Sequence, residues 1–335
     1  RAAVAADYAR AGVTVDPARV VLTASSSESY GFLFKLCCDP GDAVLCPEPS
    51  YPLFEYLTRL EGLVPIGYRL AFDGVWHVDF ASLERALGAA RRDGRRPGAL
   101  VVVSPNNPTG SFLKRDELAR LGALCRREDL ALIADEVFAP YPFVSSRSAA
   151  SDPERVTTAA VEPALTGGPP VFSLGGLSKA CGLPQLKLGW IVAGGREAAR
   201  TVGALELVAD TYLSVATPVQ AALADLLALG AGVRAAIAAR VSANRARLAA
   251  ALPGATGITA LPAEGGWSSI LRLPANRSDD AWATSLVAET GVLVQPGYFF
   301  DLSGGTFLVV SLLPAEDLFA EAIARLVAHV DAVLR

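Results

Sequence analysis

Short apolar runs alternate with amphipathic segments from residue 19 to residue 193. The apolar runs, which predict β-strands, lie at residues 19–24, 43–47, 64–70, 100–104, 130–136, 171–174 and 188–193. Segments with the helical period lie between them, at residues 26–37, 53–60, 80–92 and 115–126. This alternation predicts an α/β fold with a mostly parallel, doubly wound sheet and helices on both faces. Such a sheet binds ligands at the carboxyl ends of its strands.

The pattern changes beyond residue 140. Residues 140–170 are rich in Ser, Ala, Pro and Gly, which predicts a long excursion, and residues 196–252 are almost entirely helical in pattern. Farther on, strands are predicted at 267–273, 292–295 and 307–313, and helices at 279–290 and 317–334. We therefore predict a large domain over residues 1–235 and a smaller α+β domain over residues 236–335.

The composition narrows the classes of partner. Of the 335 residues, 52% are hydrophobic, largely through alanine, yet no uninterrupted apolar run is long enough to cross a bilayer. The most apolar stretch, residues 217–241, is interrupted by Asp225, Arg234 and Arg240 and is predicted to be a long amphipathic helix. The formal net charge is −4 and no basic tract is present, so neither a membrane nor a nucleic acid is an expected partner.

Cysteine and histidine usage gives no indication of a metal site. The five cysteines lack metal-type spacing, so reduced thiols and a cytoplasmic location are expected. The two histidines are too few for a histidine metal site or a triad, and His329, in the terminal helix, is predicted to lie on the surface. No signal peptide is recognised. Because the chain starts in helical pattern at Arg1 without a methionine, we expect an N-terminal piece to be missing.

The most informative segment is 172–190, where an apolar strand runs into a Gly/Ser turn that presents Ser178 and Lys179. A lysine held in such a turn, away from water, can lose its proton and form a Schiff base with an aldehyde cofactor. Lys187 follows eight residues later, before another apolar strand. Taken alone, Lys179 is better explained as a surface lysine in a βα loop, and only the other segments of the chain favour the Schiff-base role.

Other polar residues follow the earlier strands. Ser26 and Ser27 open a helix and either cradle a phosphate or cap that helix. Tyr51 either lies against a flat ring or belongs to the core. Asn107, in a turn fixed by two prolines, either presents its amide outward or only forms the turn. Asp135 ends a buried strand and needs a cationic partner, which is either a protonated pyridine nitrogen or a structural ion pair.

In this order, these segments resemble the class I/II aminotransferases, which are fold type I enzymes dependent on pyridoxal 5′-phosphate (PLP). The resemblance covers essentially the whole chain, and its most specific motifs are Asn107-Pro-Thr-Gly and Ser178-Lys179 with the following Gly-Leu-Pro and Lys187-Leu-Gly-Trp. It implies PLP as cofactor and a homodimer with sites near the subunit interface. The resemblance also implies a role for each candidate residue. Lys179 would form the Schiff base and act as the base, Asp135 would hydrogen-bond the pyridine nitrogen, and Asn107 the ring hydroxyl. Tyr51 would stack on the ring face, and the phosphate would be bound by Ser26, Ser27, Ser178 and Lys187.

Four positions depart from that family. Lys187 stands where an arginine is common, which keeps the charge but loses the bidentate fork. Gly176 stands where a serine often binds phosphate, and Phe138 replaces a tyrosine that donates to the ring oxygen, so a raised imine pKa is expected. Val309 occupies the place of an arginine that binds the α-carboxylate. Either another cation such as Arg272 or the missing N-terminal piece then binds the carboxylate, or the substrate is unusual. Arg272 is better explained as a solvated strand-end residue.

The leading prediction is an aminotransferase that moves an amino group from an amino acid to a 2-oxo acid through a Lys179 aldimine. A PLP-dependent decarboxylase, lyase or racemase of the same fold is an alternative, because weaker anchoring of the carboxylate changes which Cα bond reacts. A non-catalytic PLP-sensing regulatory domain is a third possibility, and it requires a DNA-binding segment upstream. The amino donor, the acceptor and the pathway are left open by the sequence.

Overall fold

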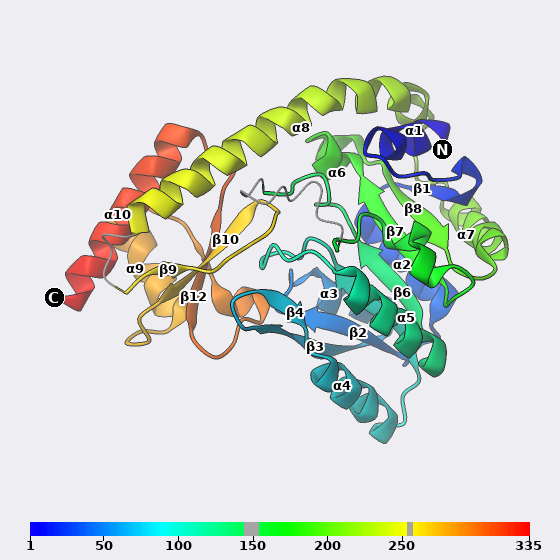
Figure 1. Ribbon diagram of the computed structural model, residues 1–335, viewed down its shortest axis with the longest axis horizontal. Helices are drawn as coiled ribbons and strands as arrows, with labels where there is room; N and C mark the ends of the chain where they lie inside the picture. Colours follow the sequence, from blue (N-terminus) through cyan, green and yellow to red (C-terminus); the bar gives the residue numbers. More distant parts are fainter. Residues whose placement is uncertain (144–153, 253–256) are drawn as a thin grey trace.

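The computed structural model describes residues 1–143, 154–252 and 257–335, and its larger part is built on an eight-stranded sheet (Figure 1). The strand order is β1-β8-β7-β6-β5-β2-β3-β4. The strands are β1 Val20–Thr23, β2 Ala43–Glu48, β3 Val64–Phe72, β4 Trp76–Val78, β5 Pro97–Val103, β6 Ala131–Asp135, β7 Val171–Gly176 and β8 Gly189–Gly194. The neighbours from β7 to β3 pair in parallel, whereas β8 is antiparallel to β1 and β7, and β4 to β3. The predicted mostly parallel α/β fold is confirmed.

Helices cover both faces of this sheet because its strands alternate their apolar side chains between two cores. Leu132 and Ala134 of β6 belong to one core, which includes residues of α1 (Ala2–Arg10), α4 (Phe80–Arg92), α5 (Arg115–Glu128) and α8 (Thr217–Ala251). Ala131 and Ile133 belong to the other, with α2 (Ser26–Cys37), α3 (Leu53–Leu60) and α7 (Ala198–Tyr212). The bounds of α2, α3 and α4 are those predicted from the sequence.

A second, four-stranded sheet lies in the C-terminal part, in the order β11-β12-β10-β9. Its strands are β9 Thr259–Ala260, β10 Ser268–Leu273, β11 Gln295–Pro296 and β12 Thr306–Ser311. One face packs against α9 (Asp279–Thr290), α10 (Glu316–Leu334) and the end of α8. The opposite face carries a small apolar cluster that contains Ile270, Phe300 and Val309.

The long helix α8 joins the two parts of the molecule (Figure 1). It contacts α1 and α6 (Leu177–Ala180) near one end and α10 near the other. The predicted domain boundary at residues 235/236 falls inside this continuous helix, and the boundary itself stays a prediction. Among the described residues, α8 alone has the length and apolar composition of a helix that could cross a membrane. One such helix does not indicate a membrane protein, because core helices of other proteins share both properties.

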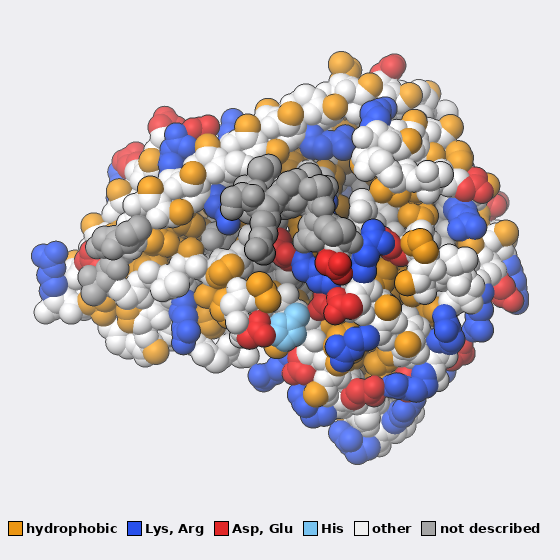
Figure 2. All heavy atoms as spheres, viewed as in Figure 1, with side chains coloured by type: hydrophobic (Ala, Val, Ile, Leu, Met, Phe, Trp, Pro, Cys, Tyr) orange, Lys and Arg blue, Asp and Glu red, His pale blue; other side chains and the backbone are white. Residues whose placement is uncertain are grey.

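The prediction that residues 217–241 form a long helix is confirmed, but its apolar residues are not confined to a buried face. Leu229 is 76% exposed and Val233 44% exposed. Figure 2 shows hydrophobic side chains mixed with charged ones along the outer side of this helix. Alanine is abundant all round α8, so the helix forms through intrinsic propensity as well as through burial.

Several predictions need correction. His329 is buried rather than on the surface: its ring lies edge-on to Trp282, and its Nε2 is 3.0 Å from the Ser285 hydroxyl. The strand predicted at 292–295 is displaced to β11, and the short strands β4 and β9 were not predicted. The five cysteines are free thiols, as expected. Part of the excursion predicted at 140–170 lies outside the described residues, and its described part contains two short 3-10 helices.

Candidate active site

The strand register brings the predicted site residues to one edge of the large sheet. Thr23 at the end of β1 and Gly176 at the end of β7 are both paired with Gly189 at the start of β8. Asp135, the last residue of β6, is paired with Val103, the last residue of β5. The segments that leave or enter the sheet at this edge carry Ser26, Ser27, Tyr51, Asn107, Asp135, Ser178, Lys179 and Lys187.

The N-terminus of α2 leaves two serine hydroxyls available. Ser25 caps this helix, because its side chain accepts a hydrogen bond from the Glu28 N–H (3.2 Å). Ser26 and Ser27 follow at the first helical positions, and within the described residues their hydroxyls make no hydrogen bond. Free hydroxyls and N–H groups at a helix N-terminus suit an anion such as a phosphate.

Two glycines, Gly176 and Gly189, allow the backbones of β1, β8 and β7 to lie close together at this end of the sheet. A Cβ on Gly189 would lie 3.0 Å from the Ser25 carbonyl carbon and 3.1 Å from Thr23 Oγ1. A Cβ on Gly176 would lie 3.2 Å from Gly189 Cα and 3.3 Å from the Leu188 oxygen. The present backbone therefore leaves little room for a serine side chain at position 176. Lys187, beside this junction, is exposed and has a left-handed backbone (φ 50°).

Lys179 lies in the short helix α6, against aromatic rings. Its Nζ is 5.4 Å from the centre of the Phe138 ring and 5.2 Å from the centre of the Trp267 ring. The Tyr141 hydroxyl donates to the Lys179 carbonyl oxygen (2.5 Å) and fixes the backbone there. Burial lowers the pKa of the Lys179 ammonium below its ordinary value, and the negative charge of Asp135 partly opposes this. The environment therefore makes this amine easier to deprotonate than a solvated lysine.

Asp135 is a buried acid without an ion-pair partner in the described part of the chain. Its Oδ1 accepts a hydrogen bond from the Val137 N–H (3.1 Å), and its Oδ2 accepts one from the Tyr30 hydroxyl (3.0 Å). Burial raises the pKa of Asp135 above its ordinary value, while these two hydrogen bonds and the charge of Lys179 act in the opposite direction. A buried carboxylate of this kind suits a cation supplied by a ligand.

The two asparagines of the 104–110 loop have different roles. Asn106 is buried: its amide donates to the Pro49 carbonyl (3.2 Å), and its oxygen accepts from the Thr109 hydroxyl (3.0 Å). It ties this loop to the segment that carries Tyr51. Asn107 is only partly buried, and its Oδ1 accepts from the Ser268 hydroxyl (3.4 Å).

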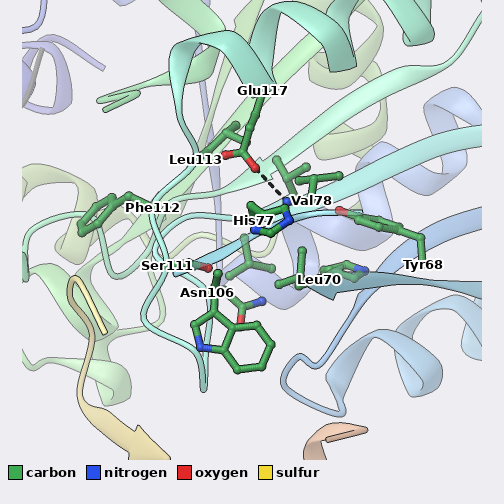
Figure 3. A pocket seen from close by; sticks show the side chains of 13 residues that line it. Tyr68, Leu70, His77, Val78, Asn106, Ser111, Phe112, Leu113 and Glu117 are labelled. Carbon is green, nitrogen blue, oxygen red and sulfur yellow. Dashed lines mark hydrogen bonds between the residues drawn. The ribbon is translucent and has the colours of Figure 1, made fainter. Parts of the chain in front are cut away.

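A cavity beside this loop is lined by Asn106 together with residues of β3 and β4 (Figure 3). In it, Glu117 Oε1 accepts a hydrogen bond from the Val78 N–H (2.8 Å), while Glu117 Oε2 accepts one from the Lys114 N–H (2.9 Å). Tyr51 lies two residues after Pro49, in the segment that the Asn106 hydrogen bond joins to this loop. Its ring is about half exposed, and its centre is 6.4 Å from that of the Phe300 ring.

Sequence reasoning missed three residues that the fold brings to this site. Tyr30, one helical turn after Ser26, contacts Asp135, and its helical spacing from the serines was the only available signal. Trp267 and Ser268 come from the smaller sheet and contact Lys179 and Asn107. Their approach across the chain left no local signal in the sequence.

Val309 and Arg272 lie on the face of the smaller sheet that includes Ser268. Val309 is paired with Ile270 and belongs to the apolar cluster with Phe300. Arg272 is four residues beyond Ser268 along β10, about 13 Å at the rise of a strand. It is exposed and lines a separate cleft with Arg69 and Asp301. Arg272 is therefore placed as the solvated strand-end residue rather than beside Lys179.

The residues at this edge fit PLP. A partly buried lysine with a lowered pKa, a buried carboxylate without an ion-pair partner and free hydroxyls at a helix N-terminus match an aldehyde, a pyridinium and a phosphate. The fold and this donor set define the class of fold type I PLP proteins.

Comparison with known proteins places the chain within that class. The model of the family "Aminotransferase class I and II" matches residues 1–326. The chain therefore belongs to the class I and II aminotransferases, which are PLP-dependent transaminases. Valine–pyruvate aminotransferase of Mycobacterium tuberculosis is 28% identical over 336 residues, covering 97% of this chain and 79% of that protein. Alanine aminotransferase of Mycobacterium bovis is 30% identical over 199 residues, covering 59% of this chain and 42% of that protein.

Solved structures share the fold. Alanine aminotransferase from Pyrococcus furiosus superposes with a TM-score of 0.82 at 23% identity, over 99% of this chain and 81% of that one. N-succinyldiaminopimelate aminotransferase from Mycobacterium tuberculosis superposes with a TM-score of 0.80 at 25% identity, over 98% of this chain and 82% of that one. The chain thus spans about four fifths of these structures.

Proposed function

We propose that this protein transfers an amino group from an amino acid to a 2-oxo acid, with Lys179 as the lysine that binds PLP. The observation that carries the proposal is the combination of Lys179, in an aromatic environment that lowers its pKa, with the buried and unpaired carboxylate of Asp135 at the same sheet edge. Membership of the class I and II aminotransferases supports it.

When bound, PLP supplies an electron sink that acidifies the substrate Cα–H. Lys179 Nζ is the base for that proton, and its lowered pKa increases the neutral fraction near pH 7. Asp135 would hold the proton on the pyridine nitrogen, and Asn107 would orient the ring hydroxyl. Phe138 and Trp267 exclude water from the lysine.

The remaining residues bind and orient. Ser26 and Ser27 offer hydroxyls at the positive end of α2, while Ser178 and Lys187, in the β7–β8 connection, would bind the phosphate from that side. Tyr51, which is about half exposed, would stack on the face of the PLP ring. Lysine at position 187 provides charge without the two parallel hydrogen bonds of an arginine.

We further propose an amino donor with an apolar side chain. Two observations support this substrate class: the lysine is walled by Phe138 and Trp267, and the cluster around Val309 offers no charge to a dicarboxylic substrate. The names of the relatives, valine–pyruvate and alanine aminotransferase, agree with it.

A cytoplasmic homodimer is part of the same proposal. Family membership supports a dimer, as do large apolar side chains that are exposed on this chain, among them Leu60, Leu207, Leu213 and Leu229. The free thiols are consistent with a reducing compartment. Sedimentation at several protein concentrations tests the oligomeric state.

The function is tested by the absorption spectrum of the PLP-loaded protein during addition of single amino acids. Conversion of the cofactor to its pyridoxamine form by alanine or valine, reversed by pyruvate, is the expected result. Release of CO₂ without that conversion indicates the decarboxylase alternative. A spectrum that no amino acid changes overturns transamination, and Lys179→Ala is the control that must show no conversion.

A further inference from the structure

Tyr30 is a buried phenol in direct contact with the acid of the proposed site. Its side chain is fully buried, and its hydroxyl donates to Asp135 Oδ2 across 3.0 Å, between residues 105 positions apart. The ring is held by Phe54, edge-on at 5.4 Å, and by Phe34 at 5.8 Å between ring centres. The phenol therefore has a fixed position relative to β6.

We propose that Tyr30 is a positioning residue that fixes the orientation of the Asp135 carboxylate and limits how strongly this carboxylate draws the proton of the pyridine nitrogen. The proposal rests on the proposed function, since the nitrogen belongs to PLP. Helix α2 would then serve both ends of the cofactor: Ser26 and Ser27 at its first turn face the phosphate, and Tyr30 one turn later supports the acid.

The carboxylate is held at both oxygens. The Val137 N–H donates to Oδ1 and the Tyr30 hydroxyl donates to Oδ2, so the plane of the group is defined by one backbone donor and one side-chain donor. Each oxygen keeps a lone pair for a further donor. Rotation of Asp135 away from a ligand would break a buried hydrogen bond, which is costly when no replacement partner is present.

A hydrogen bond from a phenol also stabilises the ionised carboxylate and makes it a weaker base. The proton stays on Tyr30, because burial and the neighbouring charge of Asp135 raise the pKa of the phenol well above its ordinary value. The other groups around the pair are Lys179 on α6, whose charge lowers the pKa of Asp135, and Cys46 on β2 and Tyr68 on β3, which raise that of Tyr30.

One more acid, Glu136, adjoins Asp135 in the chain. The pKa of Glu136 is raised to about 8, so this carboxyl is largely neutral near pH 7 and adds little negative charge beside Asp135. Among the described residues, Tyr30 is thus the side chain that hydrogen-bonds Asp135, and Lys179 is the cation that acts on it.

The test compares Tyr30→Phe with Tyr68→Phe. Tyr68, whose side chain is labelled in Figure 3, is an equally buried phenol, but its hydroxyl donates to the Val101 carbonyl (2.8 Å) and not to Asp135. The PLP dissociation constant is measured against pH. At low pH the affinity for PLP should fall as Asp135 becomes protonated; we call this part of the pH profile the acid limb. We expect the midpoint of the acid limb to rise by about one pH unit in Tyr30→Phe and to stay unchanged in Tyr68→Phe.

An acid limb of Tyr30→Phe that coincides with the wild-type limb overturns the proposal. If the wild-type protein does not bind PLP at all, the proposed function fails instead, so the two failures are distinct. Incorporation of 3-fluorotyrosine is the second variant: it keeps the phenol and makes it a stronger donor. In that protein the acid limb should move to lower pH, and an unchanged limb counts against Tyr30 whether or not Tyr30→Phe folds.

The protein without PLP gives an independent readout. Loss of the hydroxyl should destabilise both variants in urea unfolding, but the loss in Tyr30→Phe should shrink as the pH falls and Asp135 takes up a proton. The loss in Tyr68→Phe should stay constant, because its acceptor is a backbone carbonyl. Parallel pH dependence of the two variants would mean that the Tyr30 hydrogen bond has only a packing role.

Discussion

Glu136 is the buried residue that follows Asp135, and its charge state should make the stability of the protein fall as the pH rises. Its Oε1 accepts hydrogen bonds from the Ala159 N–H (2.7 Å) and the Ser173 hydroxyl (2.9 Å), whereas its Oε2 has no partner. Burial is the main reason that its pKa is raised from 4.5 to about 8; the two hydrogen bonds oppose the increase, and Asp135 and Glu162 add to it.

The magnitude follows from proton linkage. Between the unfolded pKa of 4.5 and the folded pKa of about 8, the folded protein binds one more proton at this site than the unfolded chain. The free energy of unfolding therefore falls with rising pH, by about 1.4 kcal/mol per pH unit, and the whole window corresponds to at most about 4–5 kcal/mol. Below the window, Glu136 is neutral in both states and contributes nothing to the slope.

Glu136→Gln tests this directly, because glutamine resembles the protonated acid and keeps an acceptor for Ala159 and Ser173. In urea unfolding without PLP, the variant should match the wild type near pH 4.5 and become more stable by several kcal/mol above about pH 8. Glu117→Gln is the matched control. Both Glu117 oxygens accept backbone hydrogen bonds, so its amide variant should be less stable than the wild type. A Glu136→Gln variant whose stability falls with pH as steeply as the wild type refutes the reasoning.

Four other substitutions test the proposed site. Lys179→Ala should abolish the imine absorbance of added PLP and lower turnover by about 10⁴-fold or more, measured with the amino donor that the wild type uses. Asp135→Asn should weaken PLP binding by about 10²-fold or more, because a buried ion pair loses one partner; titration of the apoprotein measures it. Phe138→Tyr should lower the pH midpoint of the cofactor absorbance band by about one unit, since a phenol then donates to the ring oxygen. Lys187→Met should weaken PLP binding by about tenfold and reduce its salt dependence, and equal salt slopes would argue against a phosphate contact.

The sequence predicted the parts of the fold that depend on local pattern. The helices α2, α4 and α9 have the predicted bounds because each begins after a capping side chain, Ser25, Asp79 and Ser278, and then follows the helical period. The mostly parallel sheet followed from the alternation of strands and helices. The strands β4 and β9, of three and two residues, are too short to give a periodic signal.

The candidate site was predicted where residues follow strand ends and was missed where contacts cross the chain. Lys179 and Asp135 could be placed because the carboxyl ends of parallel strands share one edge. The contact of Tyr30 with Asp135 depends on how α2 lies across β6, and that of Trp267 with Lys179 depends on how the smaller sheet approaches the larger one. The burial of His329 likewise depends on packing between α9 and α10.

Helix α8 is one continuous helix that contacts both parts of the molecule, so a small tilt of the helix changes their relative position. Its 35 residues extend about 52 Å, so a tilt of about 5° at one end displaces the other by roughly 4–5 Å. Near its first part, Gly230 allows close approach to Cys181, directly after the α6 helix that carries Lys179. At its far end, α8 contacts α10, which packs against the smaller sheet, and Trp267 directly precedes strand β10 of that sheet. A methyl group at position 230 would therefore push α8 away from Cys181 and tilt the helix. The tilt would produce a larger displacement at the far end of α8 and so change the distance between Trp267 and Lys179.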